Sequence, residues 1–162
     1  MLARDLMSQP VVCCYTYDNL EYAAGLLWNG DCGAVVVLDE GARAIAMLTD
    51  RDICMAAYTQ GKPLREISVR SAMSQGLQTC FADTPLESVE QMMAQHQVRR
   101  IPVVSAEGRP QGMVSINDIA RAACGQHPDV HALSNGCSLT AVARTLGAIC
   151  APRRMDPGPR IV

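Results

Sequence analysis

A hydroxyl residue followed three positions later by an aspartate occurs twice in the sequence, each time directly after an apolar run. Thr49 and Asp52 form the first pair, and Ser115 and Asp118 form the second, 66 residues further on. A hydroxyl at such a position caps a helix, and the aspartate falls in the first helical turn. The free N–H groups of a helix start, with a hydroxyl and a carboxylate, can hold a phosphate and a sugar diol. These four residues are therefore the candidate binding residues.

The spacing of 66 residues extends well beyond these two pairs. A shift by 66 aligns residues 7–9 with residues 73–75 and Cys14 with Cys80. No insertion is needed over roughly fifty residues, and a register kept over that length indicates an internal duplication.

The residue pattern of each repeat predicts the same order of elements, β-α-β-β-α, preceded by a short lead-in helix. Asp18 in the first repeat, and Thr84 followed by Pro85 in the second, are the expected starts of the amphipathic helices. The last helix of each repeat is expected to begin at the hydroxyl residue. The expected strands cover residues 11–14, 34–38 and 44–48, and then 77–80, 101–104 and 111–114.

This order of elements predicts the α/β (α+β) class, with a small sheet and helices on one face of it. A unit of about 55 residues buries too little surface alone, so we expect the repeats to pack sheet to sheet with pseudo-twofold symmetry. We place the first repeat at residues 1–62 and the second at 63–124. Residues 125–162 form a C-terminal extension, with a short helix over 138–149 and a frayed end.

Composition excludes several classes of protein. The 162 residues are 49% hydrophobic but only 4% aromatic, so we expect an aliphatic core. A net charge of −2 gives no basic surface for nucleic acid. No apolar run approaches the roughly 20 residues of a membrane span, and the N-terminus lacks the pattern of a signal peptide. We therefore expect a cytoplasmic protein with reduced cysteines and with neither nucleic acid nor a membrane as partner.

The duplicated unit, with an apolar run before each Thr/Ser-x-x-Asp motif, resembles the cystathionine beta-synthase (CBS) domain. The tandem pair over residues 1–124 is similar to a Bateman module. The resemblance implies a free-standing regulatory module that binds an adenosyl ligand between the repeats, such as AMP, ADP, ATP, S-adenosylmethionine or NAD. It also implies a homodimer and an effector protein as partners, and no required cofactor.

The family motif implies roles for individual residues. Thr49 and Ser115 match the hydroxyls on the phosphate side, and Asp52 and Asp118 match the carboxylates that bind the ribose hydroxyls. The strand whose backbone contacts the adenine edge corresponds to Val12, Cys13 and Cys14 in one repeat and to Gln78, Thr79 and Cys80 in the other.

Positive charges for the phosphates are unequally supplied. Arg99 and Arg100 match cationic positions of the family, whereas the equivalent Gly33 and Ala34 carry no charge. We therefore expect one site to bind more tightly. Ala46 stands where the second repeat has glycine, and its methyl group is expected to crowd the first site. Further candidates for the phosphate side are Arg51 and Arg70.

Two alternatives remain beside nucleotide binding. The two motifs are also acceptable helix caps, so the module could be a structural dimerisation unit with empty clefts. Trp28 is expected to pack in the core or in a dimer contact. Neither motif holds a nucleophile with an activating base, so catalysis is not indicated. A metal or thiol sensor would use the C-terminal Cys124, His127, His131 and Cys137.

Overall fold

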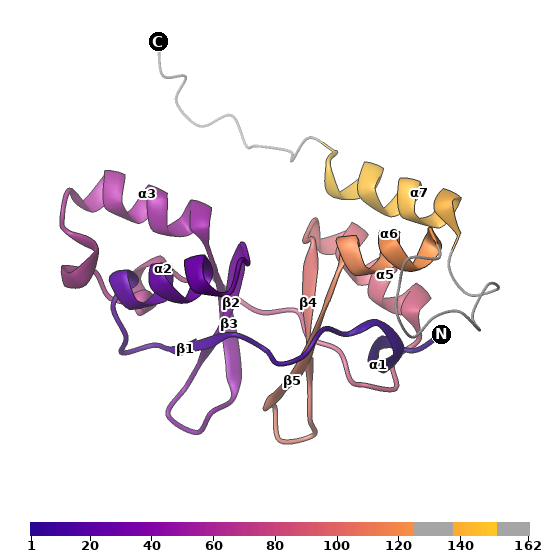
Figure 1. The fold of residues 1–162 in the computed structure, drawn as a ribbon, viewed down its shortest axis with the longest axis horizontal. Helices are drawn as coiled ribbons and strands as arrows, with labels where there is room; N and C mark the ends of the chain where they lie inside the picture. Colours follow the sequence, from indigo (N-terminus) through magenta and orange to yellow (C-terminus); the bar gives the residue numbers. More distant parts are fainter. Residues whose placement is uncertain (125–137, 152–162) are drawn as a thin grey trace, which may run out of the picture.

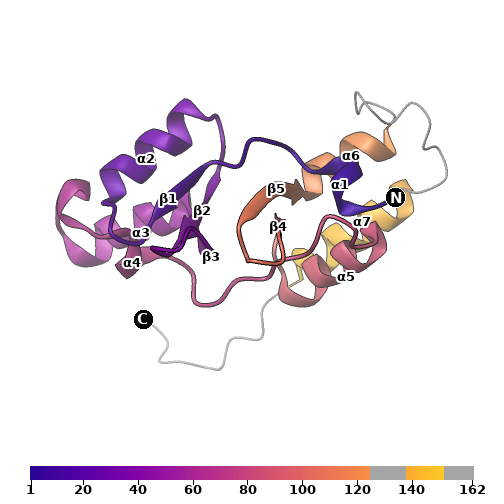
Figure 2. The same ribbon diagram turned by 90° about the horizontal axis from the view of Figure 1, so that it is seen from below.

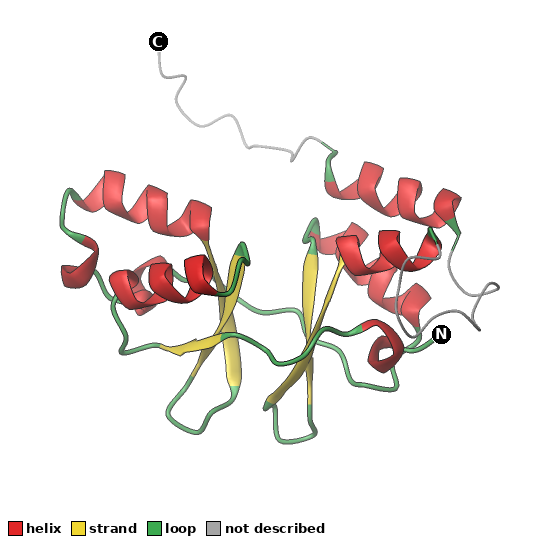
Figure 3. Cartoon of the chain, in the orientation of Figure 1, coloured by secondary structure: helices red, strands yellow, loops and turns green. Residues whose placement is uncertain are grey.

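The computed structural model describes residues 1–124 and 138–151 and has two halves, each with a small sheet covered by helices on one face (Figures 1 and 3). The two sheets face each other at the centre, as predicted. None of the helices in the described part of the chain is long and apolar enough to cross a membrane. The elements in order are α1 (Ala3–Leu6), β1 (Cys13–Tyr15), α2 (Leu20–Asn29), β2 (Ala34–Leu38), β3 (Ala44–Thr49), α3 (Asp50–Gln60), the 3-10 turn η1 (Leu64–Glu66), α4 (Val69–Ala72), α5 (Leu86–His96), β4 (Arg100–Val104), β5 (Pro110–Ser115), α6 (Ile116–Ala123) and α7 (Leu139–Ile149).

The first half has the three expected strands, in the order β1-β2-β3, with β1 parallel and β3 antiparallel to β2. Among the described residues the sheet of the second half consists of β4 and β5, because the strand predicted over 77–80 is reduced to a bridge between Cys80 and Val103. In the first half the Val36 amide donates to the Val12 carbonyl at 3.0 Å. Pro102 occupies the equivalent position and has no N–H, so the ladder cannot extend.

The predicted starts of the two amphipathic helices are wrong, because α2 begins at Leu20 and α5 at Leu86. Asn19, not Asp18, caps α2 with its side chain. The Asp18 carboxylate instead accepts from the Tyr15 amide at 2.7 Å, and the Thr84 hydroxyl accepts from the Phe81 amide at 3.0 Å. Both side chains close the turn before the helix, because a short polar side chain can bond a nearby amide in a turn as readily as in a cap.

The two lead-in helices are exchanged between the halves. Ala3 and Leu6 of α1 are buried in the core of the second half, beside Val89. Val69 of α4 is buried in the core of the first half, beside Leu20. Figure 2 shows α1 next to α6 and α4 next to α3. Each half is therefore completed by the lead-in helix of the other repeat.

The short helix expected over 138–149 is α7, which packs on α5 and α6 and covers the second half alone (Figure 1). Its Ile149 is buried, and Gln97 donates to the carbonyls of Ala148 at 3.3 Å and Ala151 at 2.9 Å. Trp28 of α2 is 87% exposed, so its expected place in the core is wrong. The buried stripe of α2 ends at Leu27 and leaves the next side chain directed to solvent.

Gly112 in β5 lies against the residue that follows α1. A Cβ atom at Gly112 would stand 2.5 Å from the Met7 Sδ and 2.9 Å from the Met7 Cβ. The equivalent residue Ala46 is buried in the core of the first half, where its methyl group is accommodated. The glycine therefore lets the crossing segment approach β5 closely.

We expect Gly112→Ala to lower the free energy of unfolding by about 1–3 kcal/mol, because Met7 must move. Urea denaturation measures it, and the double variant with Met7→Ala should lose less than the two single losses added together. Ala46→Gly serves as the matched control and should cost only about 1 kcal/mol. An unchanged stability of Gly112→Ala would show that Met7 does not pack there.

Glu90 in α5 is half-buried, and its Oε1 atom has no hydrogen-bond partner among the described residues. Burial, and then the charge of Glu87, raises the pKa of this carboxyl from its ordinary value of 4.5, while Arg144 of α7 opposes the shift. The folded state therefore holds the proton more tightly than the unfolded state. Stability is lost as the pH rises through this pKa.

Glu90→Gln should consequently be more stable than the wild type at pH 7, and the difference should vanish below pH 4.5, where the glutamate is neutral in both states. Thermal unfolding from pH 4 to pH 8 measures the difference. Glu40→Gln, at an exposed position of the turn between β2 and β3, serves as the control and should change stability little. Equal stabilities of Glu90→Gln and wild type at pH 7 would show that the charged Glu90 does not destabilise the folded state.

Candidate functional site

The two helix starts have the same backbone geometry. The Asp52 Oδ2 accepts from the Thr49 amide at 2.9 Å and from its hydroxyl at 2.7 Å, while the hydroxyl accepts from the Asp52 amide at 3.2 Å. The corresponding distances between Ser115 and Asp118 are 2.9, 2.5 and 3.3 Å. The predicted caps of α3 and α6 are therefore confirmed, and the role of these residues in binding stays a prediction.

The remaining carboxylate oxygens differ between the halves. The Asp118 Oδ1 accepts a hydrogen bond from the Arg121 guanidinium, and Asp118 is only 4% exposed. The equivalent of Arg121 in the first half is Met55, so the Asp52 Oδ1 has no such partner, and Asp52 is half-buried. Sequence reasoning missed Arg121, although its spacing of three residues from Asp118 on a helix was the available signal.

Arg100 extends from the second half toward the first. It begins β4 opposite Ser115, yet its Nη2 atom lies 3.3 Å from the position that a Cβ of Gly33 would take. The Asp50 Oδ2 lies 3.8 Å from the same position. The guanidinium therefore stands beside the start of α3, close to the acidic first residue of that helix.

The other arginines lie at the surface. The Arg99 side chain is exposed, and its carbonyl accepts from the Ile116 amide at 2.9 Å. Arg51 is exposed in the first turn of α3, and its amide donates to Asp50 at 2.7 Å. Arg70 lies in α4, the lead-in helix that packs on the first half, and its side chain is exposed.

The strand residues expected to contact adenine divide into two sets. The carbonyl of Val12 pairs with β2, and both backbone groups of Cys80 pair with β4. Because backbone groups alternate in direction along a strand, Cys14 also pairs with β2, whereas Cys13 and its equivalent Thr79 turn toward the open edge. Gln78 is the equivalent of Val12, and Pro102, at the position of Val36, has no N–H to donate to it.

Three cysteines of the strand segments expected to contact adenine have raised pKa values. Burial, and then the charge of Asp18, raises the pKa of Cys14 to about 12, and burial raises the pKa of Cys80 to about 11. Burial likewise raises the pKa of Cys13. These thiols are protonated at neutral pH and are poor nucleophiles and metal ligands. Within residues 1–124 and 138–151 no three Cys, His, Asp or Glu side chains are placed to hold a metal.

Of the four residues proposed as a C-terminal metal site, the structure describes only one. Cys124 is exposed at the end of α6. His127, His131 and Cys137 lie outside the described residues.

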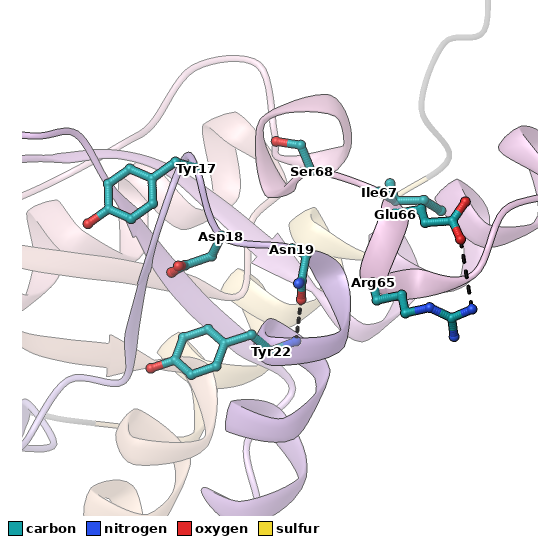
Figure 4. A pocket seen from close by; sticks show the side chains of 8 residues that line it. All are labelled: Tyr17, Asp18, Asn19, Tyr22, Arg65, Glu66, Ile67 and Ser68. Carbon is teal, nitrogen blue, oxygen red and sulfur yellow. Dashed lines mark hydrogen bonds and ion pairs between the residues drawn. The ribbon is translucent and has the colours of Figure 1, made fainter.

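Two surface hollows lie on the first half. One of about 450 Å³ lies between α2 and α3 and borders on Gly33 and Asp50 beside the start of α3. The other, of about 540 Å³, lies at the start of α2 and contains none of the predicted binding residues (Figure 4). It is lined by Tyr17, Asp18, Asn19, Tyr22, Arg65, Glu66, Ile67 and Ser68.

Known proteins share both the sequence pattern and the fold. The chain is 31% identical over 150 residues to Hypoxic response protein 1 of Mycobacterium tuberculosis, which covers 93% of this chain and 94% of the relative. A crystal structure of Hypoxic Response Protein I with two coordinated zinc ions has a TM-score of 0.67 and 32% identity, covering 75% of this chain and 98% of that one. The CBS domain pair of protein MJ0100, in complex with 5′-methylthioadenosine and S-adenosyl-L-methionine, has a TM-score of 0.67 and 25% identity, with the same coverage.

The family model of the CBS domain matches residues 3–58 and 66–125. These two ranges contain both hydroxyl–aspartate pairs and the exchanged helices. The chain therefore belongs to the CBS domain family, as a tandem pair of CBS domains.

Proposed function

We propose that this CBS pair is a regulatory module that binds an adenosyl ligand, such as AMP, ADP, ATP or S-adenosylmethionine, between its two halves. The ribose would bind to the carboxylate of a helix start, and the phosphates to the hydroxyl, the free amides and an arginine. The adenine would lie against the open strand edge at Cys13 or Thr79. Binding rather than catalysis is favoured, because the described thiols near the site are protonated.

The observation that carries this proposal is the position of Arg100. A guanidinium from the second half stands beside the N-terminus of α3, where the helix dipole and a capping hydroxyl also favour an anion. Asp50 lowers the positive potential there, and Arg51 offsets it. A ligand bound at this place would contact both halves at once. The MJ0100 pair, which holds two adenosyl compounds, supports the choice of ligand class.

A ligand that contacts both halves favours the conformation in which they are held closest. Its binding free energy would shift an equilibrium that an effector protein senses, and the effector would alter ligand affinity by the same factor. The homodimer stays a prediction, supported by the exposed side chains of Trp28 on α2 and Tyr58 on α3. The cytoplasmic location also stays a prediction.

The test is thermal unfolding with AMP, ADP, ATP, S-adenosylmethionine and NADH. A ligand at about 100 times its dissociation constant adds roughly 2.7 kcal/mol, which raises the melting temperature by roughly 5–10 °C for a chain of this size. The double variant Asp52→Ala with Asp118→Ala should lose this shift, because both ribose carboxylates are removed.

Each variant is compared with its own melting temperature without ligand, since loss of a cap costs about 1 kcal/mol by itself. Asp39→Ala, on the turn between β2 and β3, is the control and should keep the full shift. No shift of the wild type with any of the five compounds would overturn the proposal and favour a structural dimerisation module.

A second candidate function is metal sensing. It is supported by the two zinc ions coordinated in the relative of 32% identity. The ligands in this chain would be Cys124, His127, His131 and Cys137. Thiolate and imidazole groups are the usual ligands of zinc in proteins.

We expect zinc to copurify with the wild type in stoichiometric amount if this second function holds, and Cys137→Ala to lose it. Elemental analysis of protein purified without added metal measures the content. Cys54→Ala removes an exposed thiol of α3 and should leave the zinc content unchanged. Absence of zinc from the wild type, or an equal content in both variants, would exclude this site.

A further inference from the structure

The ion pair between Arg121 and Asp118 distinguishes two helix starts that are otherwise alike. Arg121 donates to the Asp118 Oδ1, while the Oδ2 accepts from the amide and the hydroxyl of Ser115. A carboxylate has about four acceptor positions, and three of them are occupied here. A ribose diol needs two. The diol can bind only if the arginine leaves.

Burial makes that exchange costly. The Asp118 side chain is 6% exposed, whereas the Arg121 side chain is 58% exposed. Displacing the arginine would leave a nearly buried carboxylate without its cation, and such a loss weakens binding by about 10- to 100-fold. The pair therefore occupies the place of the ribose in the second half.

The first half has the opposite arrangement. Met55 stands at the position of Arg121 and is 48% exposed. Because a methionine side chain carries no charge, it forms no ion pair with Asp52. The Oδ2 of Asp52 accepts from Thr49 alone, and within the described residues the Oδ1 has no donor. Both acceptor positions of the Oδ1 are therefore available to a diol.

The first amide of each helix shows the same difference. In α6 the Ile116 amide donates to the Arg99 carbonyl at 2.9 Å. In α3 no described residue accepts from the equivalent Asp50 amide. The start of α3 therefore offers one more free N–H to an anion, and Arg100 stands beside it.

We propose that the module has one competent adenosyl site, at Thr49, Asp52 and Arg100, and that Arg121 closes the second site by pairing with Asp118. This inference rests on the proposed function, because it assumes that an adenosyl ligand binds. In this proposal the residue three positions after each aspartate determines whether that aspartate can bind the ribose. Met55 leaves the first site open, and Arg121 acts on the second through Asp118 as a positioning residue.

Calorimetric titration with adenosine and with AMP counts the sites. The wild type should bind one equivalent per chain. Arg121→Met should add a second equivalent, and its affinity for adenosine should exceed that of the wild-type second site by at least about tenfold. The matched variant Met55→Arg should abolish the first site. Arg100→Gln should reduce the affinity for AMP but not that for adenosine, because only AMP carries the phosphate.

Two single variants locate the wild-type site. Asp52→Ala should abolish it, and Asp118→Ala should keep it. Two equivalents in the wild type would overturn the inference, and so would one equivalent that is lost with Asp118→Ala and kept with Asp52→Ala. In both cases the proposed function would stand. No binding by either the wild type or Arg121→Met would overturn the inference together with the proposed function.

Discussion

The exchange of α1 and α4 is the constraint on which the rest of the structure depends. Each lead-in helix is buried in the half that its own repeat does not otherwise form, so neither half has a complete core without the other repeat. Local opening at the sheet interface would therefore also expose apolar side chains of both cores. The exchange therefore ties together the two halves, of which one contributes Arg100 and the other Gly33 beside it.

Duplication fixed the backbone of the two helix starts and left their side chains free to diverge. In both, the hydroxyl and one carboxylate oxygen are needed by the fold, since they satisfy amides that the helix leaves unpaired. Only the second oxygen is available for another role. It pairs with Arg121 in one half and lacks such a pair in the other. The fold therefore tolerates either state, and a single residue one turn further along decides between them.

Local sequence patterns predicted those features of the structure that depend on residues close together in the chain. The caps at Thr49 and Ser115, the element order and most strands follow from spacing alone. The missing strand near Cys80 was also foreseeable in principle, because Pro102 removes the donor that Val36 provides. The exchange of α1 and the position of Arg100 beside Gly33 could not be predicted in this way, because they depend on contacts between residues far apart in the chain.

The two halves also differ in what covers their helices. The half with the covering helix is also the half in which the aspartate is paired. The second half carries α7 over α5 and α6, and its aspartate is buried and paired. In the first half no described segment corresponds to α7, Trp28 and Tyr58 are exposed, and its aspartate is only half-buried. A ligand at α3 would act on the half that has no counterpart of α7 among the described residues. A change in that half is the one that a partner on α2 and α3 would sense, so the ligand and the partner would be coupled through one helix.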